Sequence, residues 1–212
     1  MTATPIHGIY AVTAAGDGML DAAAGALRGG VRILQYRDKG GATEAVRRHA
    51  EAEQLRQLCS DAGALLIIND DIELAAAIGA AGVHLGREDG AVAAARARLG
   101  RRAWIGVSCY ADRARVDQAV ADGADYIALG SLFPSVTKPE AVRAPLEWVA
   151  EVRASVACPI VAIGGIEYSN IAQVAATGVD AAAVVSAIFD AGDPEAAAAE
   201  LVAAWQRAQQ RP

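Results

Sequence analysis

The chain has 212 residues, of which 54% are hydrophobic but only 5% aromatic, and it carries a formal net charge of −6. This length suits one large domain or two small ones, and the acidic balance argues against nucleic acid or an anionic membrane surface as a partner. No basic segment opens the chain and no apolar run approaches the length of a membrane span. We therefore expect a cytoplasmic protein.

The three cysteines support the same location. Cys59, Cys109 and Cys158 are scattered and lack CxxC spacing. This pattern predicts neither a disulfide framework nor a zinc site, and reduced thiols are the expected state.

Short apolar runs alternate with Ala-rich segments of helical spacing along the whole chain. Most of the runs lack polar alternation, as expected for parallel strands covered on both faces. The predicted strands are residues 8–12, 31–36, 65–69, 82–85, 104–107, 125–129, 160–163 and 181–185. A last helix over residues 194–209 should close the ring. Eight strand–helix repeats without a linker predict a single (β/α)8 TIM barrel over residues 1–212, with a doubly wound open sheet as the alternative.

A glycine recurs between the end of a helix and the next strand. Gly82, Gly123 and Gly178 stand at this position, and each is predicted to adopt the left-handed conformation that ends a helix. Two other segments break the repeat: residues 38–41 are charged and rich in glycine, and residues 133–145 form the longest irregular stretch. Connections of this length in a compact barrel are usually functional, so a mobile lid is predicted over residues 133–145.

Ligands of such barrels bind at the carboxyl ends of the strands. After the second strand, Gln35, Arg37 and Lys39 share one face by the strand period of two, and they could together grip a diphosphate. A strand end with solvated charges is the alternative. Among 19 basic residues only Lys39 and Lys138 are lysines, and both lie in loops already singled out.

Acidic residues follow the third and fourth strands. Asn69 and Asp70 lie at the mouth of the third strand, whereas Asp71 is interpreted as an ordinary helix N-cap. Asp70 and Asp89 could hold Mg²⁺ between adjacent strand ends, although Asp89 could instead cap the next helix. His84 lies within an apolar run and is interpreted as a packed core residue.

The remaining strand ends carry hydroxyl groups and glycines. Loops after the seventh and eighth strands commonly bind phosphate in these barrels, through amide groups at a helix N-terminus. The candidates at the remaining strand ends are Ser108, Ser135, Thr137, Lys138, Gly165, Val185 and Ser186.

Taken together, these motifs resemble the thiamine phosphate synthase family along nearly the whole chain. Each motif alone is weak, but their order and spacing together are specific. They are Gln-Tyr-Arg-Asp-Lys (35–39), Ile-Ile-Asn-Asp (67–70), Val-His-Leu-Gly-x-Glu-Asp (83–89), Gly-Val-Ser (106–108), Phe-Pro-Ser-Val-Thr-Lys (133–138), Ile-Gly-Gly-Ile (163–166) and Val-Val-Ser-Ala (184–187).

The resemblance implies a Mg²⁺-dependent transferase. It would join the diphosphate of a hydroxymethylpyrimidine to a hydroxyethylthiazole phosphate and release pyrophosphate. Arg37, Lys39 and Lys138 would be catalytic, and Asp70 and Asp89 would bind the metal. The implied substrate contacts are Gln35, Arg37, Lys39 and Asn69 for the pyrimidine diphosphate, Ser108 and Lys138 for the pyrimidine substrate, and Ser135, Thr137, Gly165, Val185 and Ser186 for the thiazole phosphate.

Some positions depart from the family pattern, namely Arg87, Ser135 and the pair Cys109-Tyr110. Ser135 keeps the usual hydroxyl, whereas the Cys109-Tyr110 pair leaves the pyrimidine contact around Ser108 open. A thiazole tautomerase of the same superfamily, a sugar-phosphate isomerase and a non-catalytic phosphate-binding barrel are the alternatives. The intact Asn69-Asp70 and Thr137-Lys138 motifs favour the synthase. The sequence sets no oligomeric state.

Overall fold

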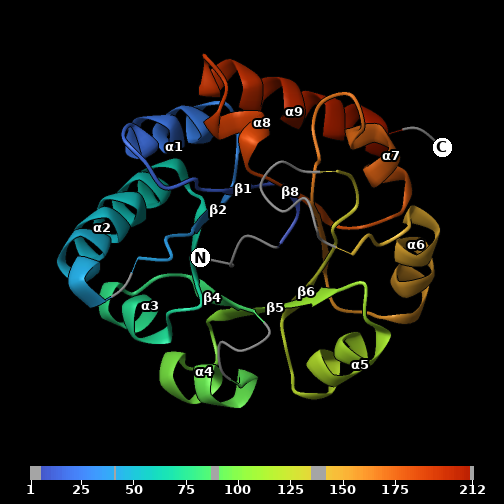
Figure 1. Cartoon of the computed structure of the whole chain (residues 1–212), viewed down its shortest axis with the longest axis horizontal. Coiled ribbons are helices and arrows are strands. Elements are labelled where there is room, and N and C mark those ends of the chain that lie inside the picture. The colour runs from blue at the N-terminus through green and yellow to red at the C-terminus, as the bar shows by residue number, and fades with distance from the viewer. Residues whose placement is uncertain (1–5, 41, 87–90, 135–141, 211–212) are drawn as a thin grey trace.

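The structure is a computed structural model that describes residues 6–40, 42–86, 91–134 and 142–210. Eight parallel strands pair in chain order, and β8 pairs with β1, so the sheet closes on itself. The helices surround these strands (Figure 1). The predicted (β/α)8 TIM barrel is therefore confirmed, and the open-sheet alternative is excluded.

The strand boundaries agree closely with the sequence pattern. Four strands have the predicted ends, β2 begins two residues later than expected, and β5 continues three residues further, through a register shift between Ser108 and Tyr110. The strands are β1 (Gly8–Val12), β2 (Ile33–Tyr36), β3 (Leu65–Asn69), β4 (Gly82–Leu85), β5 (Trp104–Tyr110), β6 (Tyr126–Leu129), β7 (Ile160–Ile163) and β8 (Ala181–Val184).

The helices follow the strands in strict alternation apart from two additions. A short 3-10 helix, Ala42–Glu44, precedes α2, and the four-residue α8 precedes the long last helix. The α-helices are α1 (Met19–Arg28), α2 (Ala45–Ala62), α3 (Ile72–Ile78), α4 (Val92–Leu99), α5 (Arg113–Ala121), α6 (Leu146–Ser155), α7 (Ile171–Ala176), α8 (Ser186–Phe189) and α9 (Pro194–Gln209). The last helix has the predicted boundaries and packs against α1 and α7, which closes the outer ring.

Two apolar layers hold the barrel together. The larger lies between the strands and the helices, and it is built mainly from Ala, Val, Ile and Leu as the composition requires. The smaller fills the barrel interior, where Tyr10 and Tyr126 are its largest fully buried members and the small side chains of Ala181 and Ala183 lie on β8. Since β8 contributes little volume, the two tyrosines can fill the centre of the barrel.

The sequence predictions for the described helix ends were correct with one exception. Asp71 caps α3, since its Oδ1 accepts a hydrogen bond from the Leu74 amide at 2.9 Å. Gly123 and Gly178 adopt the left-handed conformation, with φ of 81° and 79°. The prediction for Gly82 was wrong, because Gly79 at φ 64° ends α3 and Gly82 begins β4. A Cβ at Gly82 would lie 1.9 Å from the Trp104 carbonyl oxygen, so close approach of β5 requires glycine there.

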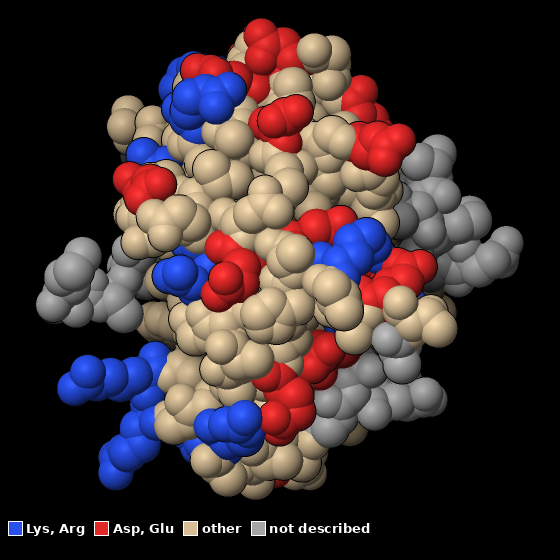
Figure 2. All heavy atoms as spheres, turned by 90° about the vertical axis from the view of Figure 1, so that its left-hand side faces the viewer, with Lys and Arg blue, Asp and Glu red and all other residues tan. Residues whose placement is uncertain are grey.

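Figure 2 shows the face of the molecule that lies on the left-hand side of Figure 1. On this face basic and acidic side chains are interspersed among uncharged residues. Several of the chain's ion pairs are solvent-exposed, among them Arg28 with Glu195 and Arg98 with Glu73. Pairs of this kind contribute little to stability, typically about 0–1 kcal/mol each. Within the described residues, the helices lack the length and apolar character needed to span a membrane.

Candidate active site

One cavity of about 470 Å³ opens at the carboxyl ends of the barrel strands. The sequence-predicted residues that it brings together are Gln35, Arg37, Lys39, Asn69, Asp70, Ser108, Gly165, Val185 and Ser186. The other predicted residues, Asp89, Ser135, Thr137 and Lys138, lie outside the described residues, as do Arg87 and most of the predicted lid. The chain thus gathers polar groups from β2, β3, β5, β7 and β8 in one place.

The end of β2 supplies the cationic part of this cavity. Gln35 is buried, whereas Arg37 is partly exposed and Lys39 is exposed. The Arg37 amide donates a hydrogen bond to Thr13 Oγ1 at 2.9 Å, which ties this segment to the end of β1. Lys39 Nζ lies 3.7 Å from Asp70 Oδ2. The expected alternation therefore brings an amide, a guanidinium and an ammonium to one cavity, next to a carboxylate.

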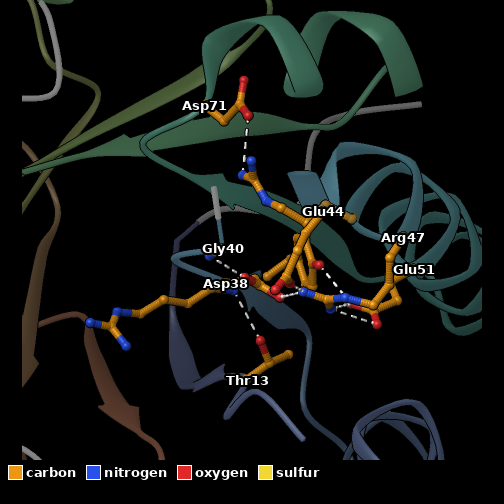
Figure 3. Close-up of polar contacts among 10 residues, drawn as sticks. Thr13, Asp38, Gly40, Glu44, Arg47, Glu51 and Asp71 are labelled. Carbon is orange, nitrogen blue, oxygen red and sulfur yellow. Dashed lines mark hydrogen bonds and ion pairs between the residues drawn. The ribbon is translucent and has the colours of Figure 1, made fainter. Parts of the chain in front are cut away.

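The loop that carries Lys39 is supported from behind by α2 (Figure 3). Asp38 Oδ1 accepts a hydrogen bond from the Gly40 amide at 2.5 Å, and its Oδ2 accepts one from Arg47 at 2.7 Å. Arg47 also binds the carboxylates of Glu44 and Glu51. Asp38 thus points away from the cavity, and its negative charge stabilises the loop instead of binding a ligand.

Asp38 should make the stability of the protein depend on pH. Burial opposes ionisation of this carboxyl, but the Gly40 amide and Arg47 outweigh it and hold the pKa of Asp38 below its usual value. Because the folded-state pKa is depressed, the stabilisation is present above the unfolded-state pKa and is lost as pH falls through the folded-state value. We predict that Asp38→Asn lowers the free energy of unfolding at pH 7 by about 1.5–3 kcal/mol, the usual range for hydrogen bonds to charged groups.

Denaturant unfolding of both proteins between pH 7 and pH 3 measures this effect. The difference between them should shrink towards pH 3. Asp17→Asn is the control, because Asp17 is exposed and makes no polar contact within the described residues, so its effect on stability should be small at every pH. A difference for Asp38→Asn that is independent of pH would contradict the assignment.

The turn after β3 directs Asp70 to the cavity. Asp70 has φ of 64°, a left-handed conformation that costs a non-glycine residue roughly 1–2 kcal/mol. Its amide donates to the His84 carbonyl oxygen at 2.8 Å, and its Oδ2 accepts a hydrogen bond from Asn69 Nδ2 at 2.6 Å. Backbone strain of this kind concentrates at functional sites, where the surrounding structure maintains it.

The groups at this turn have the chemistry of a magnesium site. Among the residues that the structure describes, no three His, Cys, Asp or Glu side chains are placed so that they could hold a metal ion together. Mg²⁺, however, commonly takes one or two protein carboxylates and completes its octahedron with water and substrate phosphate oxygens. Asp70 offers one hard oxygen ligand at the cavity wall, beside the cations that a phosphate would also contact. The donor set therefore fits this metal.

The ends of β6 and β7 form another wall of the cavity. Gly164 and Gly165 have φ of 106° and 63°, and a Cβ on either residue would collide with the segment after β6, at Ser131 or Pro134. Asn170 Nδ2 donates to the Gly165 carbonyl oxygen at 2.8 Å and fixes the turn. Both glycines are thus required by close backbone packing. The turn lines the same cavity as Ser186, the first residue of α8.

Sequence reasoning missed the polar groups deeper in the barrel. His84 is buried as expected, but its interpretation as a packed core residue was incomplete, because it lines the cavity and its Nε2 lies 2.8 Å from Ser108 Oγ. Tyr10 also lines the cavity. A signal for His84 was present: its neighbours Val83 and Leu85 face the helices, so the strand period directs His84 inward.

Comparisons with known proteins agree with this site. The sequence model of the family described as thiamine monophosphate synthase matches residues 9–188. The chain is 58% identical to the thiamine-phosphate synthase of Halorhodospira halophila over 95% of this chain and 96% of that protein. It is 52% identical to the thiamine-phosphate synthase of Chromobacterium violaceum, over 94% and 96% of the two chains.

A solved structure extends the comparison to the fold. The thiamine phosphate pyrophosphorylase of Pyrococcus furiosus superposes with a TM-score of 0.86 at 32% sequence identity, over 96% of this chain and 97% of the other. The match of sequence and fold over nearly the whole chain allows one conclusion: the chain belongs to the thiamine monophosphate synthase family.

Proposed function

We propose that the protein is a thiamine-phosphate synthase. It joins hydroxymethylpyrimidine diphosphate to hydroxyethylthiazole phosphate, and it forms thiamine phosphate and pyrophosphate. One observation carries the proposal: Arg37, Lys39, Asn69 and Asp70 line one cavity with Ser108, Gly165 and Ser186. A diphosphate, a heterocycle and a second phosphate group each find polar partners there.

The diphosphate of the pyrimidine substrate would bind at the ends of β2 and β3. Arg37 can donate paired hydrogen bonds to phosphate oxygens, and Lys39 adds a compact positive charge. Asn69 contributes its amide. Asp70, together with Asp89, would hold Mg²⁺, which supplies charge neutralisation for the departing diphosphate. The 3.7 Å contact between Lys39 and Asp70 supports this arrangement, because it brings the cation to the carboxylate that would hold the metal.

The two ring systems would occupy the rest of the cavity. Gln35 and Ser108 would contact the pyrimidine, with Lys138 as a further partner. The thiazole phosphate would bind opposite, at the ends of β6, β7 and β8, where the proposed partners are Ser135, Thr137, Gly165, Val185 and Ser186. The glycine turn at Gly164 and Gly165 supports this assignment, since it lines the cavity and has no side chain that would keep a phosphate from main-chain amide groups.

The reaction needs positioning more than a protein nucleophile. The bond between the pyrimidine methylene carbon and the diphosphate oxygen breaks, and the amino-substituted ring stabilises the resulting cation. The thiazole nitrogen then forms the new bond to that carbon, and the electron pair of the broken bond leaves with pyrophosphate. Arg37, Lys39 and Lys138 would stabilise the leaving charge. Closure of residues 133–145 over the cavity would keep water from the cation.

We predict that purified protein supplied with both substrates and Mg²⁺ forms thiamine phosphate and pyrophosphate in equal amounts. EDTA should stop the reaction, and excess Mg²⁺ should restore it. Chromatographic detection of thiamine phosphate with a coupled pyrophosphate assay measures both products, and omission of either substrate is the control. Failure to form thiamine phosphate would refute the synthase. Product formation undiminished by chelation would refute the metal site alone.

We also propose that the enzyme acts in the cytoplasm as one domain over residues 1–212. Its cysteines are free thiols, and Cys59 and Cys109 are buried. Burial raises the pKa of each of these two thiols to about 12, so both stay protonated at neutral pH. Protonated, buried thiols are poor nucleophiles, which agrees with a mechanism that uses no cysteine.

A further inference from the structure

A continuous chain of hydrogen bonds crosses the barrel interior and joins two walls of the cavity. Gln35 Nε2 on β2 donates to the Tyr10 hydroxyl at 2.8 Å, and this hydroxyl lies 3.0 Å from that of Tyr126. The Tyr126 hydroxyl lies 3.1 Å from His84 Nδ1, and His84 Nε2 lies 2.8 Å from Ser108 Oγ on β5. We call these five residues the barrel relay. Its two ends are the side chains that we propose as pyrimidine contacts.

The middle of the barrel relay is rigidly held. The rings of Tyr10 and Tyr126 are fully buried with centroids 6.2 Å apart, and His84 packs on Tyr126 at 5.6 Å. Gly106 lies against Tyr126, and a Cβ there would lie 2.0 Å from Tyr126 Cζ. Burial also raises the pKa of both tyrosines, so their hydroxyl groups stay protonated. Each hydroxyl therefore has one hydrogen that needs an acceptor.

The available partners fix which group donates and which accepts in each hydrogen bond of the barrel relay, and thus the direction of the relay. Among the described residues, the Tyr10 hydroxyl has only Gln35 Nε2 and the Tyr126 hydroxyl as partners. Because Gln35 Nε2 is a donor, the Tyr10 hydrogen must go to Tyr126. The Tyr126 hydrogen must then go to His84 Nδ1. A neutral imidazole with an unprotonated Nδ1 carries its hydrogen on Nε2, which donates to Ser108 Oγ.

This direction sets what each end offers to a ligand. The Gln35 amide uses its nitrogen towards Tyr10, so its Oε1 is left as an acceptor for the cavity. Ser108 already accepts from His84, and its own hydrogen has no acceptor within the described part of the chain, so it can donate to a ligand. We propose that Tyr10, Tyr126 and His84 are positioning residues that hold Gln35 as an acceptor and Ser108 as a donor. The site then selects a ring with a donor facing β2 and an acceptor facing β5.

The inference rests on the proposed function, because it assumes that the pyrimidine lies between Gln35 and Ser108. An aminopyrimidine has the required pattern, since its exocyclic amino group donates and its ring nitrogens accept. An analogue with an oxo group in place of the amino group would present an acceptor to the Gln35 carbonyl. The barrel relay prevents Gln35 from turning its amide to accommodate that analogue. A reversed amide would take the nitrogen of Gln35 away from its acceptor, the Tyr10 hydroxyl. It would also require every hydrogen bond of the barrel relay to reverse its direction.

Imidazole nitrogen NMR tests the direction directly. The chain contains three histidines, and His7 and His49 are exposed, so the signal of His84 can be assigned with a His84→Gln variant. In the complex with the pyrimidine diphosphate, His84 should be neutral with its hydrogen on Nε2. A hydrogen on Nδ1, or a doubly protonated ring, would overturn the proposal.

Measurement of substrate preference tests the selectivity that we propose for the barrel relay. For wild type and Tyr126→Phe, kcat/KM is measured with the amino substrate and with the oxo analogue. Loss of the Tyr126 hydroxyl leaves the Tyr10 hydrogen free to donate to a reversed Gln35 amide. The preference for the amino substrate over the oxo analogue should therefore fall about tenfold or more, the scale expected when a site loses one hydrogen bond that distinguishes two substrates. The oxo analogue has the same intrinsic reactivity with both proteins, so this reactivity cancels when the preference of the variant is divided by that of the wild type. If the oxo analogue does not react, the dissociation constants of the two compounds give the same comparison.

Tyr36→Phe is the matched control. Tyr36 is also a buried strand tyrosine, but its hydroxyl donates to Glu51 at 2.6 Å, outside the barrel interior. This variant should keep the wild-type preference even if its stability falls. An unchanged preference in Tyr126→Phe would overturn the inference while thiamine phosphate synthesis by the wild type still supports the proposed function. Absence of synthesis by the wild type would refute the function itself.

Discussion

Replacing Asp70 by asparagine is expected to lower kcat/KM at least about 100-fold, the scale of losing one electrostatic group at a reacting centre. The substitution removes the negative charge that would hold Mg²⁺, and it leaves Lys39 without the carboxylate 3.7 Å away. Asparagine tolerates the left-handed conformation that this position requires. Steady-state kinetics over a series of Mg²⁺ concentrations should therefore show that the variant needs more Mg²⁺ for half-maximal activity, with little change in the unfolding midpoint.

Asp71→Asn provides a neighbouring control for this variant. Asp71 caps α3, and asparagine is an equally good N-cap residue. It does not line the cavity. We expect the activity of Asp71→Asn to stay within about twofold of wild type, since a preserved cap leaves the turn intact. Full activity in Asp70→Asn, or equal losses in both variants, would contradict the metal assignment of Asp70.

The second large effect is expected at Arg37. Arg37→Ala should reduce kcat/KM about 100-fold, because it removes the only proposed partner that can bind phosphate oxygens in pairs. The KM for the pyrimidine diphosphate should rise while that for the thiazole phosphate changes little. Arg37→Lys should recover only part of the loss, since an ammonium restores the charge but not the planar fork.

Arg102→Ala separates this effect from a general loss of positive charge. Arg102 is exposed and precedes β5, so it lies at the opposite end of the barrel from the cavity. Its removal should leave both KM values unchanged. A parallel rise of the two KM values in Arg37→Ala would indicate that Arg37 supports the whole cavity instead of the diphosphate alone.

The sequence contained most of the information needed for the fold. Apolar runs without polar alternation identified all eight strands, because a parallel strand covered on both faces leaves little ambiguity in its pattern. The last three residues of β5 were missed because the strand continues through a register shift between Ser108 and Tyr110, and such bulges have no hydrophobic signature. Gly82 was misread because a cap and a close strand contact both require glycine, and only coordinates reveal which neighbour is near.

The site was predictable at its rim but not at its base. Gln35, Arg37 and Lys39 follow one strand with a period of two, so their common direction could be read from spacing alone. The barrel relay could not be predicted, since Tyr10 and Tyr126 are far apart in the chain and nothing in the sequence distinguishes them from other core aromatics. The role of Asp38 could not be predicted, because nothing in the sequence shows that α2 returns Arg47 to it.

Main-chain hydrogen bonds anchor the two described ends of the segment between β6 and α6. Ser131 pairs with Val142 and Ala144, while Leu132 and Phe133 donate to the carbonyl groups of Ile163 and Gly164. A hydrogen bond between main-chain groups does not depend on which side chains the bonded residues carry. These anchoring bonds can accordingly persist while side chains at this edge of the cavity change, so selection on substrates can act there separately from selection on folding.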